Sequence, residues 1–329
     1  MNIQPPLLKF YRKSALLISI TCLIGCLSAF PIFPQDSNIK YPIDEIEKML
    51  AYDPVELAIP RAVRFVGDKA KTAVLKRADG FFFRIKLKRA AQGGEDYNNQ
   101  PRYEIAAYLF QKMFLDPAEY VVPPTAGREF SAEAYRQIED DVRPTFKNTS
   151  GVYCLIQYWL DNVTAKNLFD EERFDSDSLY ARHIGNLNIF SYLIRHNDSN
   201  EGNFLISTDP ANPRVFSVDN EMAFGNITSE RGYEWRNLMV KRFPHKTVER
   251  LRKIGKEDLQ KTLGVVAQYE IREDQLIAVE PTENLAENKG IRQTTAVIQL
   301  GLTSQEIDGI FERLQDFLWK VDSGEIGTY

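Results

Sequence analysis

The chain has 329 residues, of which 43% are hydrophobic and 12% aromatic, and its formal net charge is −5. This length allows one two-lobed catalytic domain or two small domains with a large core. The negative charge and the lack of a basic-aromatic run argue against a nucleic-acid partner. The three cysteines and three histidines show no metal-ligand spacing, which argues against a zinc site.

Residues 1–26 are typical of an export leader. An apolar run over residues 14–24 follows three cations, Lys9, Arg12 and Lys13. Leu23-Ile24-Gly25-Cys26 resembles the lipobox of bacterial lipoproteins, in which the cysteine becomes lipid-modified and the leader is removed. The alternatives are cleavage near Ala29, an uncleaved anchor and a buried N-terminal helix. All but the last predict an exported chain, and a lipid or an anchor would attach it to a membrane.

A hairpin is predicted where residues 72–77 and 81–88 flank Asp79-Gly80, because Asp-Gly between two strand-like runs favours a tight turn. Alternation along the second strand places Lys86 and Lys88 on the face opposite its apolar side chains. Cations along one strand face are usually just solvated. The functional alternative is that one of the lysines reaches a cleft and holds a phosphate of ATP.

A helix is predicted over residues 101–115, because Pro101 suits a first helical position and an apolar run follows it. Glu104 lies in the first turn of this helix. A glutamate there usually interacts with the helix dipole. The functional alternative is a glutamate that pairs with a strand lysine, as in kinase sites.

The apolar run over residues 151–160 predicts a central strand that ends at Asp161, at a hinge between two lobes. Its last backbone groups could face an adenine ring, although a plain buried strand also explains the run. No G-x-G-x-x-G pattern lies near the hairpin, since Gly67 and Gly80 are too far apart to form one. The phosphates of a bound nucleotide would therefore need another cover.

The stretch from residue 195 to 226 carries the chemistry. Asp198 lies in a polar loop two positions after His196, and Asn203 follows it. Two short strand-like runs joined by a turn follow, and Asp219 comes directly after the second run. Because a hairpin brings its two ends together, Asp219 should lie close to Asp198 and Asn203. Three oxygen-bearing side chains in one small volume suit Mg²⁺ or Mn²⁺ plus one base, which phosphoryl transfer requires. The alternative is a polar surface hairpin with ordinary turn residues.

Protein kinases show a His-x-Asp-x-x-x-x-Asn pattern followed by an Asp after a second strand. The chain more specifically resembles the secretory-pathway kinases of the four-jointed and Golgi casein kinase type, over roughly residues 72–226. The segments that carry the resemblance are FFFRIKLKRA, NNQPRYEIAAYLFQKMFLDPAEYVVPPTAGR, IGNLNIFSYLIRHND and VFSVDNEMAFGN.

The resemblance implies an α+β, two-lobed, protein-kinase-like fold, with a small antiparallel-sheet N-lobe that carries one key helix and a mostly helical C-lobe. It implies ATP and Mg or Mn as cofactors, and transfer of the γ-phosphate to a hydroxyl of a protein or a glycan. The expected boundaries are a leader or anchor at 1–26, a linker and short helix at 27–60, the N-lobe at 61–160 and the C-lobe at 161–329.

The resemblance also assigns roles by position. Asp198 would be the catalytic base, Asp219 and Asn203 metal ligands, and Glu104 a metal ligand or a partner of the lysine. Lys86, with Lys88 as substitute, would hold the ATP phosphates. The family tends to have Asp-Asn-Gly where this chain has Asp-Asn-Glu, ending at Glu221. The alternative function is therefore a catalytically weak or inactive pseudokinase that acts as a lipid-anchored binding module.

Overall fold

The computed structural model describes residues 36–62 and 70–329. The predicted leader and lipobox lie outside the described residues, as does Gly67. All elements below belong to one compact unit, Ser37–Tyr329. In the described ranges no helix has both the length and the apolar character needed to cross a membrane.

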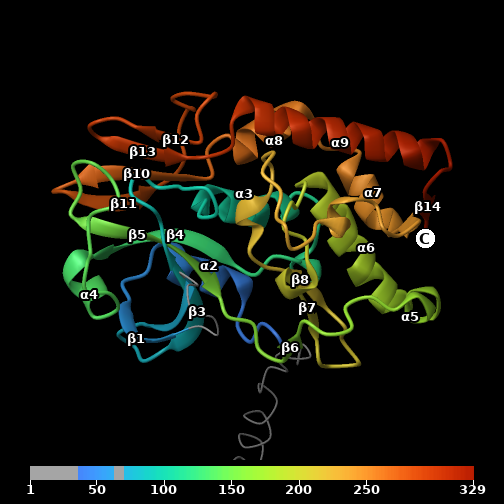
Figure 1. The fold of residues 1–329 in the computed structure, drawn as a ribbon, viewed down its shortest axis with the longest axis horizontal. Coiled ribbons are helices and arrows are strands. Elements are labelled where there is room, and N and C mark those ends of the chain that lie inside the picture. The colour runs from blue at the N-terminus through green and yellow to red at the C-terminus, as the bar shows by residue number, and fades with distance from the viewer. Residues whose placement is uncertain (1–35, 63–69) are drawn as a thin grey trace, which may run out of the picture. The chain divides into compact units, whose positions relative to one another are not determined.

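An antiparallel sheet of five strands forms the first lobe (Figure 1). Its strands, in the spatial order β1-β2-β3-β5-β4, are Glu56–Ala62, Ala70–Lys76, Phe82–Arg89, Gly151–Tyr158 and Thr125–Ser131. β2 and β3 form the predicted hairpin, with Lys76 opposite Phe82. β5, the predicted central strand, pairs with β3 on one side and β4 on the other.

Strand β5 connects two hydrophobic cores, which explains why almost all its residues are apolar. Val152, Cys154 and Ile156 point into a core formed by the sheet and helix α2 (Ile43–Ala51). Tyr153 and Leu155 point the opposite way, into a larger core that includes helices of the second lobe. The period of two along a strand therefore serves both cores at once.

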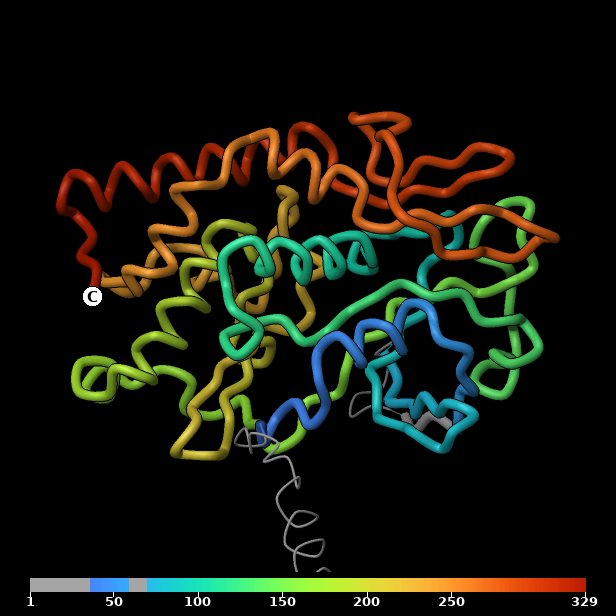
Figure 2. Tube along the Cα trace, turned by 180° about the vertical axis from the view of Figure 1, so that it is seen from behind, coloured from blue at the N-terminus to red at the C-terminus, as the bar shows by residue number. Residues whose placement is uncertain are grey.

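Helix α3 (Pro101–Gln111) begins at the predicted Pro101 and is buried on nearly all sides. Figure 2 shows it between the sheet of the first lobe and the C-terminal segments. Its last residue is Gln111, whose side chain accepts hydrogen bonds from the backbone N–H groups of Val121 and Val122 at 2.7 and 2.8 Å. These bonds fix the end of the helix. A helix held on all sides keeps its first turn, which contains Glu104, in one place.

The second lobe is mostly helical. Its helices are α5 Glu171–Ser176, α6 Ser178–Leu193, α7 His245–Leu251, α8 Lys256–Leu263 and α9 Ser304–Asp322. A capping box formed by Thr303 and Glu306 begins α9. Short strands also occur: β6 Val163–Thr164, β7 Phe204–Ser207, β8 Val215–Ser217, β9 Arg242–Phe243 and β14 Gly327–Thr328. A five-residue helix, α4 (Ala132–Arg136), lies between β4 and β5.

A second antiparallel sheet, which has four strands, was not predicted from the sequence. It is ordered β11-β10-β13-β12, with strands β10 Ala267–Arg272, β11 Gln275–Val279, β12 Ile291–Gln293 and β13 Val297–Leu300. Tyr269 donates its hydroxyl to the Gly127 carbonyl at 2.9 Å and packs edge-to-face on Tyr153. A Cβ on Gly127 would lie 1.6 Å from the Tyr153 hydroxyl, so this approach requires glycine.

These elements confirm the predicted fold class. An antiparallel sheet with one buried key helix is followed by a mostly helical lobe, which is the two-lobed arrangement of protein kinases. The smaller core lies mainly in the first lobe, and the larger core extends from the second lobe to α3 and to Tyr153 and Leu155 of β5.

Candidate active site

Asp198 lies in the loop that follows helix α6, and its own neighbours hold its carboxylate. Asn203 donates its amide nitrogen to the backbone oxygen and to Oδ2 of Asp198, both at 2.8 Å. Asn200 donates to Oδ1 at 2.9 Å. The spacing between Asp198 and Asn203 thus closes a small loop that fixes the orientation of the buried carboxylate.

The β7–β8 hairpin brings Asp219 beside this loop. Phe204 pairs with Ser217, and the Val218 N–H donates to the Asn203 carbonyl at 2.9 Å. Asp219 follows with φ of 62°, in the left-handed region that β-branched or bulky residues avoid. This turn directs the chain away from the strand, so that the carboxylate of Asp219 approaches Lys86 of β3.

Lys86 and Asp219 form an ion pair, with 3.3 Å between Nζ and Oδ1. Lys86 holds the pKa of the Asp219 carboxyl down to about 2. Burial opposes the charged form of Lys86, but the carboxylates of Asp219 and Glu104 outweigh it and raise the pKa of the lysine. The Asp219 side chain is 38% exposed, so water screens this attraction while leaving the carboxylate open to a ligand.

Glu104 binds the loop that contains Asp219 rather than a lysine. Its two carboxylate oxygens accept hydrogen bonds from the backbone N–H and the side-chain amide of Asn220, at 2.8 and 3.0 Å. The side chain is fully buried, and burial raises the pKa of its carboxyl. Glu104 therefore holds the turn after Asp219 in place from the first turn of α3.

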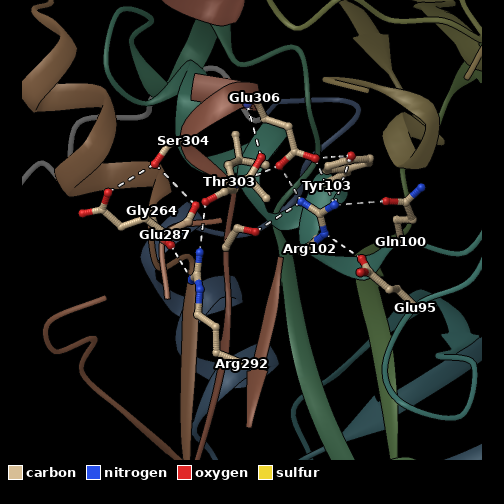
Figure 3. A network of polar contacts seen from close by, with 12 residues as sticks. Glu95, Gln100, Arg102, Tyr103, Gly264, Glu287, Arg292, Thr303, Ser304 and Glu306 are labelled. Carbon is tan, nitrogen blue, oxygen red and sulfur yellow. Dashed lines mark hydrogen bonds and ion pairs between the residues drawn. The ribbon is translucent and has the colours of Figure 1, made fainter. Parts of the chain in front are cut away.

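The first turn of α3 is also tied to the C-terminal helix (Figure 3). Arg102 donates to both carboxylate oxygens of Glu306, at 2.7 and 3.0 Å, and to Glu95 at 2.6 Å. The Tyr103 hydroxyl donates to the same Glu306 carboxylate, and its ring packs on Phe224 with centroids 5.4 Å apart. Arg102 and Tyr103 thus join the site to α9, and Tyr103 and Glu104 join it to the segment after Asp219.

Lys88 forms a separate, deeper ion pair with Glu221. Lys88 also donates to the Asn98 carbonyl at 3.0 Å. Burial raises the pKa of the Glu221 carboxyl to about 7, against the attraction of Lys88. The predicted substitute lysine and the residue that departs from the family pattern therefore bind each other.

His196 is a packing residue in this structure. Its ring is fully buried and lies edge-to-face on Phe204, with centroids 5.6 Å apart. Within the described residues neither ring nitrogen has a hydrogen-bond partner. Burial lowers the pKa of His196 to about 4, although the carboxylates of Asp198 and Asp219 oppose this shift. The ring is therefore neutral at pH 7.

A cavity of about 440 Å³ lies between the lobes and collects the predicted residues that remain accessible. It is lined by Lys86, Asn203 and Asp219, by the strand end at Tyr158, Trp159 and Leu160, and by Ala70, Pro123, Gln157, Val163, Asn200, Gly202, Leu205, Val218 and Arg231. Asp198, Lys88 and Glu104 do not line it, although Asn203, which is hydrogen-bonded to Asp198, does. An apolar wall at the strand end and polar groups opposite suit a nucleotide.

Three contacts of the site could not be found by reading the sequence. Arg231 donates to Oδ2 of Asp198 at 3.1 Å, from a polar loop with no periodic pattern. Asn220 and Glu221 bind Glu104 and Lys88 respectively, across a long separation in the chain. The only available signal was that a polar residue and an acidic residue, Asn220 and Glu221, follow Asp219 directly.

Across residues 36–62 and 70–329, no group of three or more His, Cys, Asp or Glu side chains is placed to hold a metal ion. A smaller number of carboxylates can still take part in binding a cation. Mg²⁺ commonly binds in this way, through one or two carboxylates together with substrate phosphates and water.

No protein-family model matches the chain, and no curated protein matches it. Among solved structures, the chain is similar to a hydra Fam20 structure with sugar, at 15% identity and a TM-score of 0.48, covering 84% of this chain and 88% of that one. It is also similar to a Golgi casein kinase, at 12% identity and a TM-score of 0.47, covering 86% of this chain and 76% of that one. A third similar structure is the Golgi casein kinase with Mn/ADP bound, at 12% identity and a TM-score of 0.45, covering 97% of this chain and 92% of that one. The Golgi casein kinase type, which the sequence resembles, is thus also found among the similar structures.

Proposed function

We propose that the chain is an atypical kinase that transfers the γ-phosphate of ATP to a hydroxyl of a protein or a glycan. In this proposal Asp198 accepts the proton of the attacking hydroxyl, and Lys86 holds the ATP phosphates. The observation that supports it most is the shared cavity. Lys86, Asn203 and Asp219 line it, and Asn203 is hydrogen-bonded to Asp198.

The residues present fit a divalent cation. Asp219 offers a carboxylate that is 38% exposed, and Asn203 uses its amide nitrogen on Asp198, which leaves its amide oxygen for a cation. Both are hard oxygen ligands, as Mg²⁺ and Mn²⁺ prefer. The cation would neutralise phosphate charge, and Lys86 would turn from Asp219 toward the phosphates.

The other predicted residues take supporting roles. Glu104 would position Asp219 through Asn220, because both its oxygens are already engaged there. Lys88 would hold Glu221 away from the metal ligands, because the two form an ion pair outside the cavity lining. This arrangement favours an active kinase over a pseudokinase, since Glu221 does not line the cavity and is paired with Lys88.

The proposal is tested with the full chain, labelled ATP and Mn²⁺, with casein and free sugars as acceptors. Transfer is expected to the chain itself or to an acceptor, and Asp219→Ala should abolish it. Asp209→Ala is the matched control, since Asp209 lies in the turn of the same hairpin and its side chain accepts a hydrogen bond from the Ala211 N–H in that turn. Transfer that survives Asp219→Ala would show that the site is wrongly assigned. Stabilisation by ATP and Mn²⁺ without any transfer would favour the inactive binding module.

We also propose export and membrane attachment through the leader, with Cys26 as the lipid-modified residue. The support is the order of cations, apolar run and lipobox-like segment in the sequence. Cys26→Ser should move the chain from the membrane fraction to the soluble exported fraction. An unchanged membrane fraction would favour an uncleaved anchor, and a cytosolic wild-type chain would refute export.

A further inference from the structure

Arg231 is a cation at the cavity that the proposed function does not yet use. Its guanidinium donates to Asp198 Oδ2 at 3.1 Å, and its side chain is 70% exposed while that of Asp198 is 3% exposed. Within the described part of the chain this is the one polar contact of its side chain. A guanidinium has five N–H groups, so most of its donors are available to a ligand.

The cavity lining contains few cationic side chains. Only two of the described lining residues are cationic, Lys86 and Arg231. Lys86 is paired with Asp219, the proposed metal ligand, and its side chain is 18% exposed. Arg231 is therefore the lining cation that lies on the side of the proposed base.

The loop that carries Arg231 is fastened to the catalytic loop on both sides of it. The Ser229 N–H donates to the Asn197 carbonyl at 2.9 Å. Arg236 donates to the Asn197 side-chain oxygen at 3.0 Å, and its guanidinium stacks on Tyr233 at 4.0 Å. Both anchors lie on the residue next to Asp198. Arg231 is thus presented to the base by a fixed loop rather than by a free one.

We propose that Arg231 is a catalytic residue that neutralises the negative charge on the transferring phosphoryl group, an inference that rests on the proposed kinase activity. The base must lie within hydrogen-bond reach of the attacking hydroxyl. The attacked phosphorus then lies about 3–3.5 Å beyond that oxygen. A guanidinium already bonded to the base can reach the phosphoryl oxygens by a small rotation, and charge on those oxygens is what the site must stabilise.

The two asparagines make this movement possible without disturbing the base. Asn203 stays on Oδ2 and Asn200 on Oδ1 when Arg231 leaves, so the Asp198 carboxylate keeps its orientation. The departure of Arg231 also frees a lone pair on Oδ2 for the proton of the attacking hydroxyl. In the transfer, the hydroxyl oxygen forms a bond to phosphorus, the bond to the ADP oxygen breaks, and the hydroxyl proton goes to Asp198.

The test compares wild type, Arg231→Ala and Arg231→Lys in the full chain with MnATP. The control is Arg143→Ala, since Arg143 is exposed, forms one loose ion pair with Asp141 at 3.9 Å and does not line the cavity. We expect kcat for transfer to casein, and for acceptor-free ATP hydrolysis, to fall together by about 100- to 1,000-fold in Arg231→Ala. The affinity for ADP should stay unchanged, lysine should restore part of the rate, and added guanidinium ion should partly rescue the alanine variant.

Each other result decides against the inference. A rate that rises in Arg231→Ala would mean that the arginine blocks the base. A higher acceptor KM with unchanged ATP hydrolysis would mean that it binds the acceptor, and an unchanged rate would mean that it is only a surface contact. If the wild-type chain binds MnATP but neither transfers nor hydrolyses it, the proposed function fails first, and the inference falls with it. If wild type transfers and Arg231→Ala does so equally well, the inference alone fails.

Discussion

Removal of either partner of the ion pair between Lys88 and Glu221 should strongly lower the free energy of unfolding. The two side chains are 10% and 2% exposed, so little water screens them. Glu221→Gln leaves the ammonium group with neutral acceptors, the Asn98 carbonyl and the amide oxygen of the new side chain. We expect this change to lower the free energy of unfolding by about 3–5 kcal/mol at pH values well above 7, where Glu221 is charged in the folded wild type, because an uncompensated buried charge remains. Lys88→Met should cost a similar amount at pH values well above 7.

The pH dependence of the Lys88→Met variant follows from the raised pKa of Glu221. Burial raises this pKa to about 7 even with Lys88 present, so the folded state holds the proton more tightly than the unfolded state does. Such a group loses stability as the pH rises from its unfolded pKa through its folded pKa. Without Lys88 the folded pKa is higher still. The cost of Lys88→Met should therefore shrink as the pH is lowered toward 5.

The assay is urea unfolding of Glu221→Gln, of the single variants Lys88→Met and Glu221→Leu, and of the double variant Lys88→Met/Glu221→Leu. The double variant should be about as stable as wild type, since an apolar pair of similar volume replaces a buried ion pair at little cost. The double-mutant cycle then gives a large coupling energy. Single variants that each cost less than about 1 kcal/mol would show that water reaches the pair and would refute the reasoning. A double variant that costs the sum of the two singles would refute it as well.

Two further changes probe the surroundings of the site. The neutral form of His196 is favoured by folding, because burial lowers its pKa to about 4, so its contribution is complete above pH 6.5 and is lost as the pH falls toward 4. His196→Phe should therefore remove about 3 kcal/mol of acid sensitivity over that range, measured as unfolding free energy against pH, and an unchanged slope would contradict the assignment. Arg102→Met should cost about 3–5 kcal/mol, because it strands the buried Glu306 carboxylate. Arg102→Lys should recover only part of this loss in the same assay, since lysine lacks the planar fork, and full recovery would show that charge alone matters.

Much of the fold could be predicted because its signals are local. Asp79-Gly80 between two strand-like runs predicts the β2–β3 hairpin, and a proline before an apolar run predicts the start of α3. The loop that places Asp198 and Asn203 together is also local, since both residues lie within a few positions of each other. The second sheet, β10–β13, was missed, because its strands are short and its pairing depends on partners distant in sequence.

The order of the amino acids shows which side chains are available and which neighbours along the chain can meet. It could not determine how the row of lysines on β3 is divided between partners. Only tertiary packing decides that Lys86 meets Asp219 at the cavity, while Lys88 meets Glu221 behind it. The same holds for Arg231 and Asp198, whose contact joins two loops with no common pattern. A pattern along the chain reports the face on which a side chain lies, whereas the partner of a charge depends on which distant carboxylate the folded chain brings within reach.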